Sequence, residues 1–385
     1  MRTLLVWFVI VTGLSTYSPL ASVLWYAVVT GLVPFVSVTL PARPAPVMTQ
    51  VADGVYLFKT APYGDVGLDG NSIAIISTDG VLVFDTNGTP AAAAAVLADI
   101  RTLTPQPVRV IVNSHWHWDH WYGTEVYQRA FPEVRIIAQD NTRAMMMGPA
   151  LEFNRPGLER DLPAYITGLK QAVAKGEATT PALASLPQLR ERLETAEWFL
   201  AQKSAVVHTF PNTTFTDKLT IYLGDREIQI LNYGRAITPG DAFLYLPKDR
   251  VLVTGDLLVN PITFALSCYP SEWLHALERL DQLDVATIVP GHGDPLHDKV
   301  LLHATMEVIR TLLREGKAMK AKGLDADQAK DAILPSLSVA MQQITGGNHA
   351  LDDAFKVQLV DWCLHRVYDE LNGPLTDAIA AIPVK

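Results

Sequence analysis

The chain contains little cysteine and no concentration of positive charge. Its 385 residues include only two cysteines, Cys268 and Cys363, which are far apart, so neither a disulfide framework nor a thiolate metal site is expected. Lysine and arginine number 31 against 40 acidic residues, and the net charge is −9. Basic runs interleaved with aromatic residues are missing as well. These absences argue against an enzyme that acts on nucleic acid.

Charge is also missing from the beginning of the chain. Between Arg2 and Arg43 the sequence carries no charged residue, and one membrane span needs about 20 apolar residues. Residues 3–13 are typical of a signal-peptide core and residues 18–22 of a cleavage region, but a second apolar stretch follows directly. We therefore expect residues 1–42 to be a cleaved signal, a single membrane anchor or a helical hairpin. Export or anchoring on the extracytoplasmic side is preferred, although an arginine at each flank leaves the orientation open.

Three histidines and one aspartate fall within six consecutive positions. The segment His115-Trp116-His117-Trp118-Asp119-His120 holds three of the ten histidines of the chain. It directly follows an apolar β-branched run at 108–113, which predicts a buried strand, and α/β folds bind ligands at the carboxyl ends of strands. Imidazole and carboxylate donors suit zinc and, less specifically, iron or manganese. A histidine-rich surface loop without function is the alternative.

Two later segments repeat this arrangement of a strand followed by a donor. A predicted strand at 251–254 leads through Gly255 to Asp256. A short apolar run at 287–290 leads to His292, which stands between two glycines. These donors are candidates for the same metal site.

Together these motifs resemble those of the metallo-β-lactamase superfamily of metal-dependent hydrolases. The matching segments lie between about residues 51 and 298 and comprise the H-x-H-x-D-H loop, Thr254-Gly255-Asp256, Pro290-Gly291-His292-Gly293, and the run 81–85 followed by Thr86-Asn87-Gly88. The resemblance implies an α/β fold, namely an αββα four-layer sandwich, for a domain at 48–298. It identifies no substrate.

The resemblance also implies how two metal ions would be bound. The first ion would take His115, His117 and a third histidine, and the second would take Asp119, His120 and His292, with Asp256 bridging both. The third histidine belongs to a Gly-x-x-His-Thr-x-Gly-Asp segment, in which this chain has Ile237 instead. Three protein ligands plus water still make an adequate catalytic zinc shell. We therefore expect one tightly held ion, zinc in the first instance with iron or manganese as alternatives, and partial occupancy of the other position.

The implied activity is hydrolysis of an ester, lactone, amide or related bond of a small molecule by a metal-bound hydroxide. Asp119 would bind metal, orient the nucleophilic water and accept its proton. Asp85 either supports the site through a histidine or forms the turn before Asn87-Gly88. The residues that bind substrate stay unassigned. Two other functions remain open, namely an iron-dependent oxidoreductase acting on a sulfur compound and a binding protein that has lost catalysis.

Two helical additions to the sandwich are expected. Residues 141–205 are rich in Ala, Leu, Glu, Lys and Gln, with apolar residues at helical spacing. This insertion forms either a lid, with residues 145–147 and Phe153 as an apolar wall, or a packing or self-association element. Residues 299–385 predict a C-terminal helical extension that supports the sandwich or forms an oligomer surface. The oligomeric state is left open.

Overall fold

The computed structural model describes residues 20–22, 39–41, 45–176 and 185–377, which fall into two compact units divided between Pro44 and Ala45. In the first unit, β1 (Leu20–Ser22) pairs antiparallel with β2 (Thr39–Pro41). Most of the expected signal or anchor segment at 1–42 lies outside the described residues. Within the part of the chain that the structure describes, no helix is both long and apolar enough to cross a membrane.

The second unit contains a seven-stranded sheet with the order β3-β4-β5-β6-β7-β8-β9. Strands β3 to β6 form an antiparallel meander, and β6 to β9 are parallel. The strand predicted at 108–113 is confirmed as β7, and the run 81–85 corresponds to β6. The bounds are β3 (Val47–Ala52), β4 (Val55–Lys59), β5 (Ser72–Ser77), β6 (Gly80–Phe84), β7 (Val108–Val112), β8 (Arg135–Gln139) and β9 (Thr213–Phe215).

A second, five-stranded sheet has the order β10-β11-β12-β13-β14. Its strands are antiparallel except for the last pair, β13 and β14, which are parallel. Parallel pairing places the residues that follow β13 and β14 at the same edge. The bounds are β10 (Lys218–Leu223), β11 (Arg226–Leu231), β12 (Phe243–Leu246), β13 (Val251–Gly255) and β14 (Thr287–Pro290).

Three apolar clusters stack these sheets and helices into four layers. One cluster joins side chains of both sheets, including Phe84 and Val253, and fills the interior between them. A second covers the outer face of the first sheet with helices α1 (Pro90–Leu103) and α3 (Thr124–Ala130). The third covers the outer face of the second sheet with α8 (Pro270–Asp281), α9 (Val300–Ala321) and later helices. The predicted αββα sandwich is confirmed.

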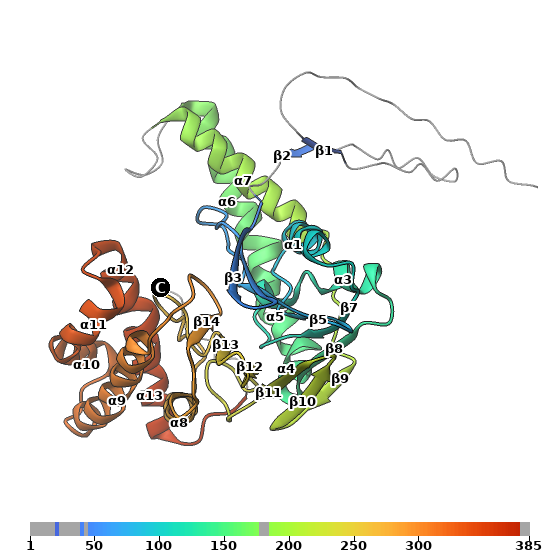
Figure 1. Cartoon of the computed structure of the whole chain (residues 1–385). Helices are drawn as coiled ribbons and strands as arrows, with labels where there is room; N and C mark the ends of the chain where they lie inside the picture. The colour runs from blue at the N-terminus through green and yellow to red at the C-terminus, as the bar shows by residue number, and fades with distance from the viewer. Residues whose placement is uncertain (1–19, 23–38, 42–44, 177–184, 378–385) are drawn as a thin grey trace, which may run out of the picture. The chain divides into compact units, whose positions relative to one another are not determined.

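The helical insertion between β8 and β9 is also confirmed. It comprises α4 (Asp140–Met146), α5 (Pro149–Pro156), the π-helical turn η1 (Gly157–Asp161), α6 (Leu162–Lys175) and α7 (Leu186–Ser204). Helices α6 and α7 run side by side (Figure 1) and share a small apolar core that includes Leu169 and Leu189. Ser185 caps α7 by accepting a hydrogen bond from the backbone N–H of Gln188.

The chain ends in helices that gather beside β12 to β14 (Figure 1). They are α9, α10 (Ala326–Ile333), the 3₁₀ turn η2 (Leu334–Leu337), α11 (Ser338–Thr345), α12 (His349–Ala354), the π-helical turn η3 (Phe355–Asp361) and α13 (Trp362–Asn372). Their buried side chains belong to the same apolar cluster as the outer face of the second sheet. The predicted C-terminal extension is therefore confirmed as a layer that packs on this sheet.

Candidate metal centre

The loop after β7 holds four of the six predicted ligands. The strand ends at Val112, and three residues later His115 enters a short bend that leads into the single helical turn α2 (Trp118–Trp121). His115 and His120 are fully buried, and the centroids of their rings are 4.4 Å apart. Asp256 follows β13 and His292 follows β14, so the remaining two ligands come from the neighbouring strand ends of the second sheet.

The structure brings all six residues together in two groups, His115, His117 and Asp256, and Asp119, His120 and His292. Within each group one donor atom from each residue lies within 4.8 Å of the others. In the first group Oδ2 of Asp256 is 3.6 Å from Nε2 of His115 and 3.9 Å from Nδ1 of His117. In the second group Nε2 of His292 is 3.1 Å from Oδ2 of Asp119.

Asp256 reaches both groups. Its Oδ2 faces the first group, whereas its Oδ1 is 3.4 Å from Nε2 of His120 and 3.6 Å from Nε2 of His292. This is the position that a bridging carboxylate between two ions needs. The predicted bridging position of Asp256 therefore agrees with its geometry.

Two buried donor atoms at this centre have no hydrogen-bond partner among the described residues. They are Nε2 of His115 and Oδ1 of Asp256. A buried polar atom without a partner costs about 1–3 kcal/mol, and native folds seldom leave one so. Both atoms point into the donor groups, and neutral imidazole and carboxylate are the donors that zinc prefers. The residues present thus fit a divalent metal ion.

The Nδ1 atoms of the two buried histidines, His115 and His120, make hydrogen bonds outside the donor groups. Nδ1 of His120 donates to Oδ2 of Asp85 at 2.7 Å, and Nδ1 of His115 donates to Oγ of Ser114 at 2.8 Å. Ser114 in turn donates to Asp85 through its backbone N–H and its hydroxyl, both at 2.7 Å. In each ring Nε2 is therefore left for the metal. Asp85 combines both predicted roles, because it also lies at a turn with a φ of 58°.

The turn that carries His292 accepts hydrogen bonds from Asn71, which directly precedes β5 of the first sheet. The side-chain Nδ2 of Asn71 donates to the carbonyl oxygens of Pro290 and Gly293, both at 2.9 Å. The backbone N–H of Asn71 donates to Gly291 at 2.7 Å. At Gly291 a Cβ atom would lie 2.0 Å from Oδ1 of Asp256, so only glycine fits at this position. Asn71 thus fixes the distance between the two sheets at the metal centre.

The charges at the centre influence one another strongly. Burial is the largest single influence and raises the pKa of Asp119 and of Asp256, but the neighbouring His120 and His292 together outweigh it and hold both pKa values well below the usual range. Burial and the nearby His120 lower the pKa of His115 well below its usual value. Ionised carboxylates and a neutral imidazole are the protonation states in which these groups bind metal.

Ile237 contributes no donor atom to the centre, because its side chain is a hydrocarbon. It is fully buried and belongs to the apolar cluster between the second sheet and the C-terminal helices. The loop around it is stabilised by a hydrogen bond of 2.8 Å, which Oδ2 of Asp241 accepts from the backbone N–H of Thr238. Among the described residues, no side chain of this loop joins either donor group.

The insertion contributes aromatic and apolar side chains beside the metal loop. Trp116 and Trp121 are buried with Met145 and Met146, so these residues form core packing. The ring of Trp116 also contacts the ring of Phe153 edge-on at 5.7 Å. Met147 and Phe153 remain 50% and 44% exposed, and they are the residues of the expected apolar wall that solvent reaches.

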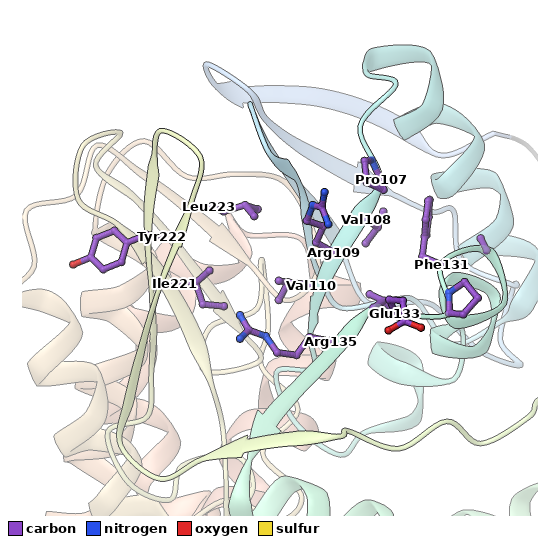
Figure 2. Close-up of a pocket in the computed structure, with 13 residues that line it drawn as sticks. Pro107, Val108, Arg109, Val110, Phe131, Glu133, Arg135, Ile221, Tyr222 and Leu223 are labelled. Atoms are coloured by element: carbon purple, nitrogen blue, oxygen red, sulfur yellow. The ribbon is translucent and has the colours of Figure 1, made fainter.

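A cavity of about 500 Å³ lies elsewhere, between the sheets. Arg109 at the beginning of β7 and Arg135 at the beginning of β8 face Ile221 and Leu223 of β10 across it (Figure 2). The metal loop follows the other end of β7. None of the six candidate ligands lines this cavity.

Comparison with known families agrees with this geometry. The family model of the metallo-β-lactamase superfamily matches residues 65–292, which is more than half of the chain. The chain therefore belongs to the metallo-β-lactamase superfamily. A linear primary-alkylsulfatase from Pseudomonas sp. (strain ATCC 19151) is 25% identical over an alignment that covers 67% of this chain and 49% of the relative. The chain thus spans about half the length of this relative.

Solved structures of metallo-β-lactamases show low sequence identity to this chain. The metallo-β-lactamase from Pontibacter korlensis is 19% identical with a TM-score of 0.48, and the match covers 69% of this chain and 99% of that one. The DIM-1 metallo-β-lactamase exposed to ceftazidime is 16% identical with a TM-score of 0.47, covering 70% of this chain and 99% of that one. The family assignment rests on the family model.

Several residues that shape the centre were not found from the sequence. Ser114 directly precedes the histidine motif, and its position before His115 is the only available signal. Asn71 and Gly70 belong to a loop far from the motifs, and a Cβ atom at Gly70 would lie 2.5 Å from the ring of His120. Lys203, on α7, lies over the ring of Trp118. These residues are recognisable only in three dimensions.

Proposed function

We propose that this protein is a metal-dependent hydrolase that cleaves an ester, lactone, amide or related bond of a small molecule, with zinc as its metal. The observation that carries the proposal is the convergence of six imidazole and carboxylate donors in two groups that share Asp256. A bound divalent ion would supply hydroxide at neutral pH and would polarise the oxygen of the bond to be cleaved. A nucleophilic serine or cysteine is then not required.

The six candidate ligands differ in how far solvent reaches them. His115, His120 and Asp256 are almost fully buried, whereas the side chains of His117, His292 and Asp119 are 16%, 16% and 12% exposed. The substrate would therefore approach from the side of the latter three. Asp119 is the acidic group on that side, and its carboxylate would orient the attacking water and hold its proton.

The loss of one histidine at Ile237 supports unequal occupancy of the two positions. The group of Asp119, His120 and His292 has three protein donors with Asp256 within reach, and Asp85 fixes the ring of His120. The group of His115 and His117 has only Asp256 in addition. We therefore propose one firmly bound ion in the former group and an exchangeable ion in the latter.

The test combines metal analysis with a substrate panel. The purified chain is analysed for metal by mass spectrometry and assayed against ester, lactone, phosphodiester, β-lactam and alkyl sulfate substrates, the last because of the alkylsulfatase relative. Hydrolysis of at least one substrate should disappear on chelation and return with Zn²⁺. Asp119→Asn should lower kcat by about 10²–10⁴-fold, whereas the exposed Asp225→Asn should not change it. Hydrolysis that survives chelation would refute the proposal.

We also propose that residues 1–42 direct the protein to export or to a membrane. The support is the uncharged sequence between Arg2 and Arg43. Fractionation of cells that express the full chain with a C-terminal tag tests this proposal. Recovery of the tag only in the cytoplasmic fraction would contradict it.

A further inference from the structure

Lys203 is a partly buried lysine whose amino group is itself buried and makes no hydrogen bond to the described residues. It lies in the last turn of α7, and its Nζ has no hydrogen-bond partner among the described residues. Lysine is almost never buried in this way, because its ammonium group loses hydration. Burial accordingly lowers its pKa well below the usual value, while the carboxylates of Asp119 and Asp69 act in the opposite direction.

Aromatic rings take the place of the missing acceptors. The Nζ of Lys203 is 3.4 Å from the centroid of the Trp118 ring and 4.1 Å from that of Tyr122. An amino group over an aromatic face is attracted by the negative centre of the ring, most strongly when water is excluded. Lys203 therefore holds the plane of Trp118 in one orientation.

Trp118 is also in close contact with the turn after β6. At Gly88, in the turn after β6, a Cβ atom would lie 2.5 Å from the Trp118 ring and 2.7 Å from the Cα atom of Asp119. The turn at Gly88 and the amino group of Lys203 thus both restrict the position of the ring. Because Trp118 directly precedes Asp119, this confinement also fixes the backbone from which the Asp119 carboxylate extends.

The end of α7 that carries Lys203 is itself anchored to the sandwich. Oε1 of Gln202 accepts a hydrogen bond from the backbone N–H of Ala91 in the first turn of α1, at 3.0 Å. The ring of Phe199 packs on Trp118 with a centroid distance of 5.7 Å and on Tyr63 with one of 5.3 Å. The position of Lys203 is therefore determined by contacts on several sides.

We propose that Lys203 is a positioning residue for Asp119, acting through Trp118, so that the helical insertion completes the metal centre. The inference rests on the proposed metal centre. A lysine that only filled space would be replaced with benefit by an apolar side chain, because an unpaired buried amine is unfavourable. Retention of the amine at a cost in stability is the pattern of a residue that serves a site.

The test compares Lys203→Met with wild type in two measurements. Methionine keeps the length of the stem and removes the nitrogen. Titration of the metal-free protein with Co²⁺, followed by the visible absorption of the bound ion, should show binding weakened by about tenfold or more with an altered spectrum, since loss of groups that orient ligands costs about 10–100-fold in affinity. The urea midpoint of the metal-free variant should be unchanged or higher. Lys203→Gln provides a second variant if the first does not fold.

Control variants distinguish a positioning role of Lys203 from a general effect of charge or packing. Lys175→Met, at an exposed lysine of the same insertion, should bind Co²⁺ as wild type does. In a double-mutant cycle with Trp118→Phe, the double variant should lose little more affinity than the more affected single variant, whereas additive losses would overturn a route through Trp118. Equal or tighter Co²⁺ binding by Lys203→Met, as expected if the lysine only repelled cations, would refute the inference. A wild type that binds no Co²⁺ would instead refute the proposed function.

Discussion

Nδ1 of His120 donates a hydrogen bond of 2.7 Å to Oδ2 of Asp85, and this contact joins the loop after β7 to the end of β6. It fixes the tautomer of the imidazole, because the proton on Nδ1 leaves the lone pair of Nε2 facing Asp119, Asp256 and His292. The same carboxylate accepts two hydrogen bonds from Ser114. One buried aspartate thus orients one histidine directly and the other, His115, through a serine.

Replacement of Asp85 should therefore weaken metal binding without removing a ligand. In Asp85→Asn the amide nitrogen cannot accept the hydrogen bonds that one of the carboxylate oxygens accepts. We expect the Zn²⁺ affinity to fall by about 10–100-fold in a competition titration with a chromophoric chelator. Asp79→Asn, at an exposed position near the end of β5, is the matched control. Wild-type affinity in Asp85→Asn would show that the ring of His120 is held in other ways.

Restoration of a histidine at position 237 should increase the metal content. The expected result for Ile237→His is a rise from about one to about two ions per chain, because a third imidazole would complete the group of His115 and His117. Ile237→Leu, which keeps an apolar side chain of similar volume, should leave the content unchanged. The number of metal ions per chain after dialysis, measured by mass spectrometry, tests this prediction. Two firmly bound ions in wild type would contradict the prediction.

The stability of the metal-free protein should depend on pH through Asp69. Burial raises the pKa of this carboxyl from 3.8 to about 6, although Tyr63 and the backbone N–H of Gly88 donate hydrogen bonds to it. A raised pKa in the folded state favours the protonated form. The stabilisation of the folded state by the protonated Asp69 carboxyl is therefore complete below pH 3.8 and is lost as the pH rises through about 6.

Asp69→Asn removes this titration while keeping an acceptor for Gly88. The unfolding free energy of wild type relative to the variant should fall by roughly 3 kcal/mol at most between pH 4 and pH 7.5. Urea denaturation of both metal-free proteins across this range measures the difference. A pH-independent difference would mean that folding does not raise the pKa of Asp69.

A single added methyl group at Gly291 should disturb the centre. The Cβ atom of Gly291→Ala would lie 2.0 Å from Oδ1 of Asp256, so either the carboxylate or the turn must move. We expect a loss of at least half of the bound metal. Gly168→Ala is the control, because its Cβ atom meets nothing within 4 Å in the described part of the chain, its own helix backbone aside, and alanine favours the helix by up to about 1 kcal/mol. Full metal content in Gly291→Ala would contradict this expectation.

The sequence predicted the strands that deliver the ligands because these strands are continuous apolar runs followed by polar donors. Strand β3 was missed because its first four residues are exposed and carry no burial pattern, and β9 because it is only three residues long. Serine is a common N-cap residue, but Ser271 does not cap α8, because the helix already begins at Pro270 and the hydroxyl of Ser271 donates to Glu370.

Lys203 shows the limit of sequence reasoning at the site. A lysine in a helix rich in charged residues indicates a solvated face, and nothing in the local pattern suggests burial against Trp118. The contact depends on how the insertion returns to the sandwich, which is a matter of tertiary packing. The histidine motif, by contrast, carries its chemistry within six residues, and its ligands could therefore be named in advance.

The origin of the donors has a consequence for the order of events in biosynthesis. Four donors, His115, His117, Asp119 and His120, follow β7 of the first sheet, whereas Asp256 and His292 follow the last two strands of the second sheet. A growing chain that has emerged from the ribosome only as far as the insertion would present four donors without the bridging carboxylate. In the proposed centre, firm capture of the metal would therefore wait until the turn after β14 has been synthesised and has formed its hydrogen bonds with Asn71, so metal loading would be a late step in maturation.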